Sequence, residues 1–462
     1  MRALFQRTIQ SAVAWTFLAT MLRMGANVFV LPLILRKLPP EHLGLWYVFL
    51  TIGGVASLLD FGFEPTITRM ASYAWGGASR FIAFGIHQEE RGEAGANRPN
   101  LPLLAELVAT LKAYYFWVGV AILTLLGIGG GIWIWLQTAH LPGAASLRLA
   151  WLAYAVGCCL NFISGRWPAL LTGIGALKEG QYVSIISLLV YYIVAVAGLV
   201  AGMGLWALVL AGIGMGWVLR SFGRHVFRRM STLPGLPPAR FHREIFSAIW
   251  PNAWRMGLVS LGAFLAVSAN TLICGAFLGL KTTASYGVSF QLVSLLGSLS
   301  AVWVQVKMPT FNQLRLQKQD GEIVRIFVGR MRLFILSYLA GTFAILYLAP
   351  MALQMIGSKT TLLSFWPLAV FALIKFLEMH QWLYAQLVLS ENLNPFLKPS
   401  LISGAATAVL AFVLTPKFGV WGLLIAEGVV QTCYCNWWCV LLALRGLKLD
   451  PYRYFVHFFF QR

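Results

Sequence analysis

The hydrophobic pattern of the chain is a series of long apolar runs separated by short polar segments. Most runs reach about 20 residues, the length with which an α-helix crosses the hydrocarbon core of a membrane. The pattern therefore predicts an all-α polytopic membrane protein with about twelve transmembrane helices. The predicted spans are 10–35, 43–65, 113–136, 149–172, 181–202, 204–224, 247–275, 284–307, 330–353, 362–389, 398–416 and 420–443.

Composition agrees with this interpretation. Apolar residues make up 59% of the chain and charged residues 11%, and the mean hydropathy is +0.75. Soluble proteins have about 45–50% apolar and about 25% charged residues, so an ordinary soluble enzyme and a disordered chain are both excluded. The first apolar run follows Arg2 and Arg7 and continues through Leu35. That is too long for a cleaved signal peptide, and we expect the first span to be retained.

The net charge of +20 comes from 35 Lys and Arg against 15 Asp and Glu. A basic chain can bind nucleic acid or carry positive cytoplasmic loops, and the hydropathy favours the loops. With a cytoplasmic N-terminus, 25 of these cations lie on cytoplasmic segments, 6 outside and 4 within spans. Both termini and the loops 66–112, 225–246 and 308–329 are then predicted to be cytoplasmic. We expect an interfacial helix at 101–112, and a segment of the third loop lying on anionic membrane lipid.

Short repeats relate the two halves of the chain. Two glycine-x-tryptophan hairpins and two arginine-methionine-glycine segments recur: Gly204-Leu205-Trp206 with Gly419-Val420-Trp421, and Arg23-Met24-Gly25 with Arg255-Met256-Gly257. They indicate a duplicated architecture of two pseudo-symmetric six-helix lobes. The predicted domains are an N-terminal lobe at 1–224, a basic cytoplasmic linker at 225–246, and a C-terminal lobe with a basic tail at 247–462. Such repeats place a substrate site at the interface between the lobes, near the membrane midplane.

Four basic residues fall inside predicted spans: Arg23, Arg166, Arg255 and Lys375. A charge at the bilayer centre costs about 2.5–3.5 kcal/mol, so each must face a partner, water or the interior of the bundle. Arg23 and Arg255 occupy the first span of each half and have no acid within four residues on their own helix. Because guanidinium binds phosphate bidentately, they are candidates for binding an anionic substrate. The alternative is pairing with Glu427 or Glu378 on another helix.

The other in-span charges leave two interpretations open. Arg166 precedes Trp167-Pro168, so a helix break there would free backbone carbonyls as partners, and substrate binding is the alternative. Lys375 and Glu378 are three residues apart on one helix, so Lys375 either is neutralised by Glu378 or contacts substrate.

A further charged group lies near the inner end of the second predicted span. Asp60 and Glu64 are four residues apart and within reach of Arg69. The spacing indicates a salt-bridge cluster with a structural or gating role.

The sequence contains no recognisable catalytic or metal-binding pattern. The six cysteines lie within apolar runs, so a disulfide framework is not expected, and one helix would scatter Cys433, Cys435 and Cys439 around its circumference. The chain contains no Walker A, H-E-x-x-H or G-x-S-x-G motif. We therefore predict that the protein is not an enzyme and needs neither a metal nor a cofactor.

Five short segments of the chain resemble those of a known family. Residues 31–46 (LPLILRKLPPEHLGLW) and 58–64 (LLDFGFE) resemble the first hairpin of bacterial polysaccharide transporters, the O-antigen (Wzx-type) lipid-linked oligosaccharide flippases. Residues 391–396 (ENLNPF) and the two glycine-x-tryptophan hairpins are also similar to that family.

The resemblance implies a multidrug/oligosaccharidyl-lipid/polysaccharide exporter fold, which is MATE-like, in a bacterial inner membrane. It implies a flippase that moves an undecaprenyl-diphosphate-linked oligosaccharide, such as an O-antigen, capsule or exopolysaccharide repeat unit, by alternating access. Arg23 and Arg255 would then bind the diphosphate or acidic sugars. Ion antiport with H⁺ or Na⁺, and other polysaccharide assembly proteins as partners, are further implications. The candidate coupling carboxylates are Asp60, Glu64, Glu378 and Glu427.

Two other functions compete with this interpretation. A multidrug/cation antiporter of the same superfamily needs an acidic cavity, whereas this chain has arginine at the corresponding places. A membrane polysaccharide polymerase or ligase needs catalytic groups on a sizeable outer loop, and the outer loops predicted here are short.

The charge asymmetry makes a testable prediction of topology. Reporter fusions at Gly143 and Arg228 should report opposite sides of the membrane, with Arg228 in the cytoplasm, because positive loops are retained on that side. The activities of periplasmic and cytoplasmic reporters measure this directly. The same side at both positions would contradict the twelve-span topology.

Overall fold

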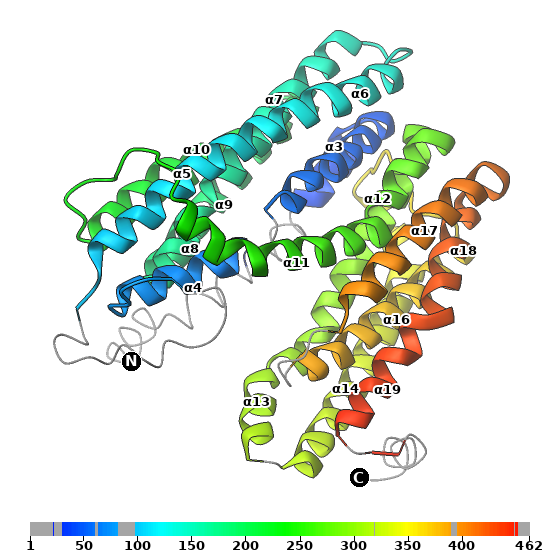
Figure 1. Ribbon diagram of the computed structural model, residues 1–462. Coiled ribbons are helices and arrows are strands. Elements are labelled where there is room, and N and C mark those ends of the chain that lie inside the picture. The colour runs from blue at the N-terminus through cyan, green and yellow to red at the C-terminus, as the bar shows by residue number, and fades with distance from the viewer. Residues whose placement is uncertain are drawn as a thin grey trace, which may run out of the picture. The chain divides into compact units, whose positions relative to one another are not determined.

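The computed structural model describes residues 22, 30–60, 63–81, 98–317, 319–389, 395–447 and 449–450. These residues form helices and connecting turns, without a β-strand among them (Figure 1). The helices are α3 (Pro40–Leu58), α4 (Phe63–Trp75), α5 (Leu101–Thr124), α6 (Gly131–Gln137), α7 (Ala144–Ser164), α8 (Arg166–Gly173), α9 (Leu177–Val200), α10 (Leu205–Met230), α11 (Arg243–Val267), α12 (Ala269–Gln305), α13 (Met308–Leu316), α14 (Asp320–Phe343), α15 (Ala349–Met355), α16 (Phe365–Leu389), α17 (Leu397–Phe418), α18 (Val420–Val430) and α19 (Asn436–Gly446). Three π-helical turns lie within them: η1 (Leu125–Gly130), η2 (Ala344–Leu348) and η3 (Gln431–Cys435).

The helices coincide with the predicted spans. Every predicted span from 43–65 onward overlaps a described helix, and the first, 10–35, lies largely outside the described residues. Within the part of the chain that the structure describes, 7 helical stretches are long and apolar enough to cross a membrane. They are Leu101–Gln137, Ala144–Gly173, Leu177–Val200, Leu205–Met230, Gly257–Gln305, Asp320–Met355 and Leu397–Phe418. The longest of them is interrupted at Gly279, whose φ of 79° is not helical, so it corresponds to two of the predicted spans.

One predicted element is wrong. The separate interfacial helix expected at 101–112 does not exist, because α5 continues without a break from Leu101 to Thr124. Its start is fixed by Asn100, whose side-chain oxygen accepts a hydrogen bond of 3.0 Å from the backbone N–H of Leu103. Pro102 occupies the first turn, where a missing N–H costs nothing.

The two glycine-x-tryptophan hairpins share one backbone conformation. Gly204, directly before α10, has φ 60° and ψ −131°, and Gly419, directly before α18, has φ 60° and ψ −136°. Side chains with a Cβ rarely adopt a positive φ, so glycine is needed at both places. The same rare conformation at repeated positions agrees with a duplicated, two-lobe architecture.

The chain forms two compact units, which we call the first and second unit. The first unit comprises Met1–Leu38 with Phe49–Ser260, and the second comprises Pro39–Val48 with Leu261–Arg462. Helices α3 and α11 pass from one unit into the other. The domain boundaries predicted from the sequence, with a linker at 225–246, remain a prediction.

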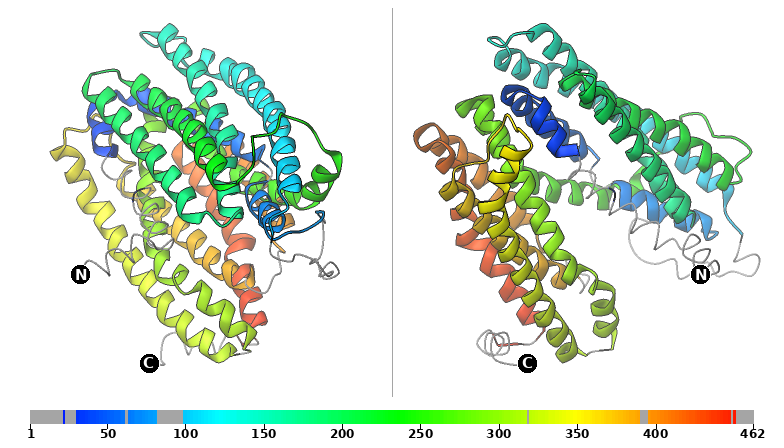
Figure 2. Two further views of the ribbon diagram at one scale, coloured as in Figure 1. Left: turned by 90° about the vertical axis from the view of Figure 1, so that its left-hand side faces the viewer. Right: turned by 180° about the vertical axis from the view of Figure 1, so that it is seen from behind.

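The core of the first unit is built by α4, α5 and α8, with α10 and the start of α11 packed against them. Its large buried side chains include Phe63, Leu107, Trp167, Phe227 and Ile249. Figures 1 and 2 show α9 lying beside α10, and these two helices make extensive contact.

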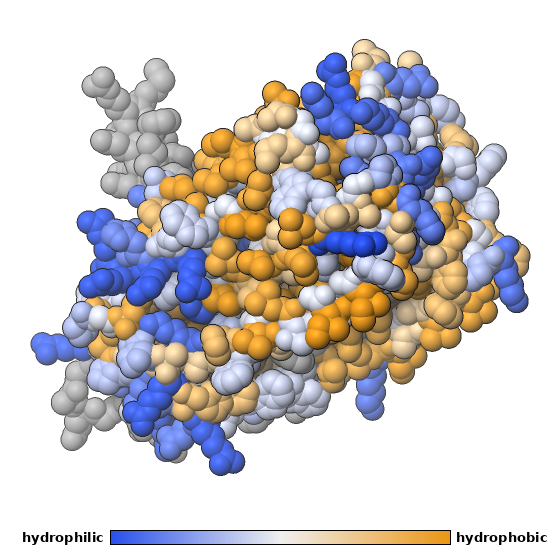
Figure 3. All heavy atoms as spheres, turned by 90° about the horizontal axis from the view of Figure 1, so that it is seen from above, coloured by the Kyte–Doolittle hydropathy of each residue, from blue (hydrophilic) through white to orange (hydrophobic). Residues whose placement is uncertain are grey.

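Many large apolar side chains remain exposed on the outside of the helices. They include Ile128, Leu149, Trp217, Leu336 and Ile402. Figure 3 shows wide orange, hydrophobic areas on the face that it presents. A water-soluble protein rarely exposes so much contiguous apolar surface, whereas a lipid-facing helix requires it. Together with the spanning helices, this surface defines a multi-pass membrane protein.

Candidate functional site

A buried group of charged residues lies in the second unit. Lys375 on α16 places its Nζ 2.7 Å from Glu378 Oε2 on the same helix and 2.7 Å from Glu427 Oε1 on α18. The side chains of Lys375 and Glu427 are only 8% and 1% exposed, whereas that of Glu378 is 26% exposed. We call Lys375, Glu378 and Glu427 the lysine cluster. The pairing of Lys375 with Glu378, one of the two interpretations that the sequence left open, is present, and Glu427 adds a second carboxylate.

Two further contacts complete the lysine cluster. Asn270 on α12 donates a hydrogen bond of 3.1 Å from Nδ2 to Glu427 Oε2. The ammonium of Lys375 lies 5.1 Å from the ring centre of Phe290 and 5.7 Å from that of Phe371, within cation–π range. Because each carboxylate and the ammonium have close partners, the cost of burying them is largely offset.

In the first unit, Asp60 fixes the turn between α3 and α4. Its Oδ1 accepts a hydrogen bond of 2.9 Å from the hydroxyl of Tyr115 on α5, and its Oδ2 accepts one of 3.3 Å from the backbone N–H of Glu64. A carboxylate at this position caps the N-terminus of α4 and interacts favourably with its dipole. Asp60 is therefore held by α4 and α5.

The predicted salt-bridge cluster around Arg69 is not formed. Glu64 and Arg69 are exposed on α4, and Arg69 makes no ion pair with any residue that the structure describes. Arg69 follows Glu64 by five residues, which is outside the three- or four-residue spacing that brings side chains together on a helix. A gating role for these residues stays a prediction.

Arg166 lies at the junction of α7 and α8. Helix α7 ends at Ser164 and α8 begins at Arg166, but Gly165 between them has helical φ and ψ of −57° and −25°, so the helix break predicted there is not formed. The Arg166 guanidinium carbon lies 5.6 Å from the ring centre of Tyr115 and 5.0 Å from that of Trp167. Asp60 and Arg166 thus both contact Tyr115, although nothing in the sequence connects them.

The side chain of Arg166 is 7% exposed, and its Nε has no hydrogen-bond partner among the described residues. Together with Lys112, Arg220 and Arg224 it lines a cavity of about 320 Å³. We call this cavity the basic pocket. Its complete lining is Lys112, Phe116, Ile163, Arg166, Trp167, Arg220, Arg224 and Ala239.

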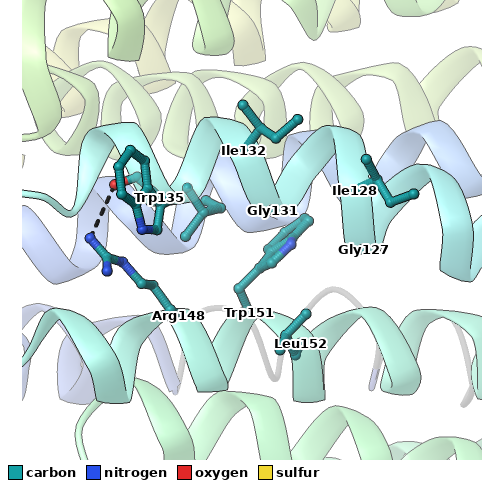
Figure 4. Close-up of a pocket in the computed structure, with 9 residues that line it drawn as sticks. Gly127, Ile128, Gly131, Ile132, Trp135, Arg148, Trp151 and Leu152 are labelled. Carbon is teal, nitrogen blue, oxygen red and sulfur yellow. Dashed lines mark hydrogen bonds between the residues drawn. The ribbon is translucent and has the colours of Figure 1, made fainter.

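A second cavity, of 380 Å³, lies at the other end of α7 and is mostly apolar (Figure 4). Its one charged lining residue, Arg148, donates from Nη2 to the backbone oxygen of Trp135 at 3.3 Å and from Nε to Thr138 Oγ1 at 3.2 Å. Trp151 donates from its indole nitrogen to the oxygen of Leu126 in the π-helical turn η1, at 3.0 Å. These bonds join α6 and η1 to α7, so we interpret this cavity as structural.

The substrate-binding hypothesis depends on two arginines, Arg23 and Arg255. Arg23 lies outside the described residues. For Arg255 the structure describes the backbone, which is helical within α11. Their role therefore stays a prediction.

Several residues of these sites were not singled out from the sequence. Tyr115 and Asn270 interact with predicted residues that are 55 and 157 positions away along the chain. Asn270 offered a signal, since it is an isolated amide at the end of an apolar span. Three pocket residues entered the prediction from sequence only through the count of cytoplasmic charges that sets the topology: Lys112, Arg220 and Arg224. Nothing in the hydrophobic pattern shows that their helices meet at one cavity.

Comparison with known proteins gives no match by sequence. No family model and no curated protein sequence match the chain. Solved structures do match it over nearly its whole length. One is an inward-facing multidrug resistance MATE family transporter of the MOP superfamily, with 13% identity, 95% of this chain and 99% of that chain covered, and a TM-score of 0.64.

A second similar structure is the lipid II flippase MurJ in an inward closed conformation, which is 10% identical in sequence. The match covers 96% of this chain and 90% of the MurJ chain, with a TM-score of 0.64. A third is a MOP superfamily transporter from Pyrococcus furiosus whose binding pocket is described as having reverse polarity. It is 12% identical, and the match covers 96% of this chain and 98% of that chain, with a TM-score of 0.56. The protein therefore has the two-lobe, MATE-like fold of MOP superfamily transporters. Proteins with that fold include a multidrug transporter and a lipid flippase.

The lysine cluster makes a testable prediction about stability. Lys375→Met should lower the free energy of unfolding by about 3–5 kcal/mol, because it leaves Glu427 buried without its cation. The double variant Lys375→Met/Glu427→Gln should recover a large part of that loss, since the uncompensated charge is then gone. Reversible unfolding of the purified protein in mixed micelles measures both values.

Lys359→Met is the matched control, because Lys359 is exposed in the connection between α15 and α16. It should change stability by about 0.5 kcal/mol or less. Equal, small effects at both lysines would show that the cluster does not stabilise the second unit.

Proposed function

We propose that the protein is a flippase for an undecaprenyl-diphosphate-linked oligosaccharide, the repeat unit of a bacterial O-antigen, capsule or exopolysaccharide. It moves this lipid from the inner to the outer leaflet of the bacterial inner membrane by alternating access. The observation that carries the proposal is that Arg166, a buried cation within a predicted span, makes no ion pair with a described residue. In the sequence, Arg23 and Arg255 are two further in-span arginines with no acid within four residues along the chain.

Guanidinium groups are well suited to bind a diphosphate. Their planar donors match two phosphate oxygens at once, and they stay charged at every physiological pH. Arg23 and Arg255, at matching positions in the two halves, are proposed to bind the diphosphate. Arg166 is a further candidate. Lys375, the fourth candidate from the sequence, already has two carboxylate partners, which favours a role in ion coupling instead.

The lysine cluster supplies the carboxylates that ion coupling would need. Glu378 is its most exposed member and is therefore our candidate for exchanging H⁺ or Na⁺, while Glu427 is enclosed. Asp60 is a second candidate in the first unit, where it is held by Tyr115. Cytoplasmic termini and cooperation with other polysaccharide assembly proteins belong to the same proposal.

A multidrug/cation antiporter is the second candidate function, because the fold is shared with a MATE transporter and the lysine cluster contains two carboxylates. Lys375 neutralises one of those charges, which makes the cluster less suited to a cationic drug. The enzymatic alternative receives no support from the similar structures, which are transporters.

Transport by the purified full chain in proteoliposomes tests the proposal. A fluorescent undecaprenyl-diphosphate oligosaccharide should exchange between leaflets in the presence of the wild-type protein. Arg23→Ala and Arg255→Ala should each reduce the rate at least about tenfold, as expected for loss of a charge-assisted contact of about 1.5–3 kcal/mol. Arg23→Lys and Arg255→Lys should keep part of it, because they retain charge and lose the bidentate geometry.

Arg228→Ala is the control, since Arg228 is exposed in the last turn of α10. Ethidium transport in the same vesicles distinguishes the second candidate. Ethidium movement without lipid exchange would replace the flippase by a cation antiporter, and wild-type rates in both alanine variants would remove the arginines from the mechanism.

A further inference from the structure

The basic pocket of the first unit concentrates positive charge without compensation. Lys112 on α5, Arg166 on α8, and Arg220 and Arg224 on α10 all line it, and no carboxylate belongs to its lining. None of the four forms an ion pair with a carboxylate in the described part of the chain. Like charges gathered in this way repel one another, so an anion in the pocket would relieve a real cost.

Buried hydrogen-bond donors in the pocket lining also lack partners. Nε of Arg166 and the indole nitrogen of Trp167 are both buried, and neither has a hydrogen-bond acceptor among the described residues. A buried donor left unsatisfied costs about 1–3 kcal/mol. Lys112, by contrast, uses one of its three N–H groups on the backbone oxygen of Pro237 and keeps the others available. The pocket therefore offers donors as well as charge.

The position of the pocket along the helices matches the depth of lipid headgroups. Helix α10 has 26 residues and is about 39 Å long, longer than the roughly 30 Å hydrocarbon core. Arg220, Arg224, Arg228 and Arg229 all fall in its last 11 residues, at the end that the charge distribution predicts to be cytoplasmic. The cations thus lie where the phosphates of the inner leaflet are expected.

An apolar path leads away from the pocket along α5. Phe116, which lines the pocket, is 58% exposed, and Val120 and Leu123 are exposed on the same face one and two turns further along the helix. This face continues toward the middle of the helix, away from Lys112. A free phosphate would leave it uncovered, whereas an acyl chain attached to a phosphate would cover it.

We propose that the basic pocket binds the phosphate of an anionic phospholipid, whose acyl chain lies along Phe116, Val120 and Leu123. Arg220 and Arg224 meet the phosphate at the open side, and Arg166 and Lys112 meet it from the floor. This proposal does not depend on the proposed function, and it assigns Arg166, named above as a further candidate for the cargo diphosphate, to the phosphate of a bound phospholipid instead. It would anchor the first unit to the anionic inner leaflet.

Lipid binding to the detergent-solubilised full chain, measured by native mass spectrometry, tests this site. Dioleoylphosphatidylglycerol is the probe, and dioleoylphosphatidylcholine, with the same chains and no net charge, is the comparison. Arg220→Gln/Arg224→Gln should weaken phosphatidylglycerol binding by about thirtyfold, as expected for two headgroup contacts. Arg228→Gln/Arg229→Gln removes the same charge from the same helix end outside the pocket and should have a much smaller effect.

The comparison ligands decide between sources of phosphate. Equal losses in the two double variants, or equal binding of phosphatidylcholine, would reduce the site to diffuse surface charge and overturn the proposal. Inorganic pyrophosphate binding as tightly as phosphatidylglycerol would exclude a role for the acyl chain. Undecaprenyl diphosphate displacing phosphatidylglycerol at equal concentration would assign the pocket to the cargo instead. Arg220→Gln alone keeps the test decisive if the double variant does not fold, and it should show about one half of the loss on a logarithmic scale.

Discussion

The contact between Lys375 and Glu427 illustrates the constraint on which this structure depends, that a charge within the membrane must find a partner. The ammonium lies 2.7 Å from carboxylates of two residues, and Asn270 occupies the remaining oxygen of Glu427. These contacts connect α12, α16 and α18, so the same bonds that offset desolvation also fix the packing of the second unit. A group held in this way can respond to an ion only through its most exposed member, Glu378.

The first unit meets the same constraint differently. Arg166 is buried against the rings of Tyr115 and Trp167 and has no carboxylate partner among the described residues, while Asp60 is occupied by Tyr115 and the start of α4. Two halves with matching glycine hairpins therefore differ in charge: one contains an ion-paired cluster of one lysine and two glutamates, and the other a basic pocket without a carboxylate in its lining. This difference is the basis of our proposals that the second unit couples to an ion and that the first unit binds phosphate.

Hydropathy predicted most of the fold, because a membrane span needs only a run of apolar residues and the backbone then has no alternative to a helix. The spacing of Lys375 and Glu378 indicated pairing as one of two interpretations, since that contact is set within one helix. The contacts of Glu427 with Lys375 and of Tyr115 with Asp60 depend instead on how distant helices pack, which local spacing does not encode. The expectation of a separate interfacial helix at 101–112 was wrong for a similar reason. The polar residues of this segment are visible in the sequence, but its continuity with the following span in α5 is not.

Equilibrium binding to the purified protein tests most directly whether its substrate is an anionic lipid. Quenching of intrinsic tryptophan fluorescence can compare an undecaprenyl-diphosphate oligosaccharide, undecaprenol and ethidium at one ionic strength. The account predicts saturable binding of the diphosphate lipid that weakens as salt is added, and at least about tenfold weaker binding of undecaprenol, because charge-assisted contacts to phosphate contribute about 1.5–3 kcal/mol. Tighter binding of ethidium than of the diphosphate lipid would contradict it.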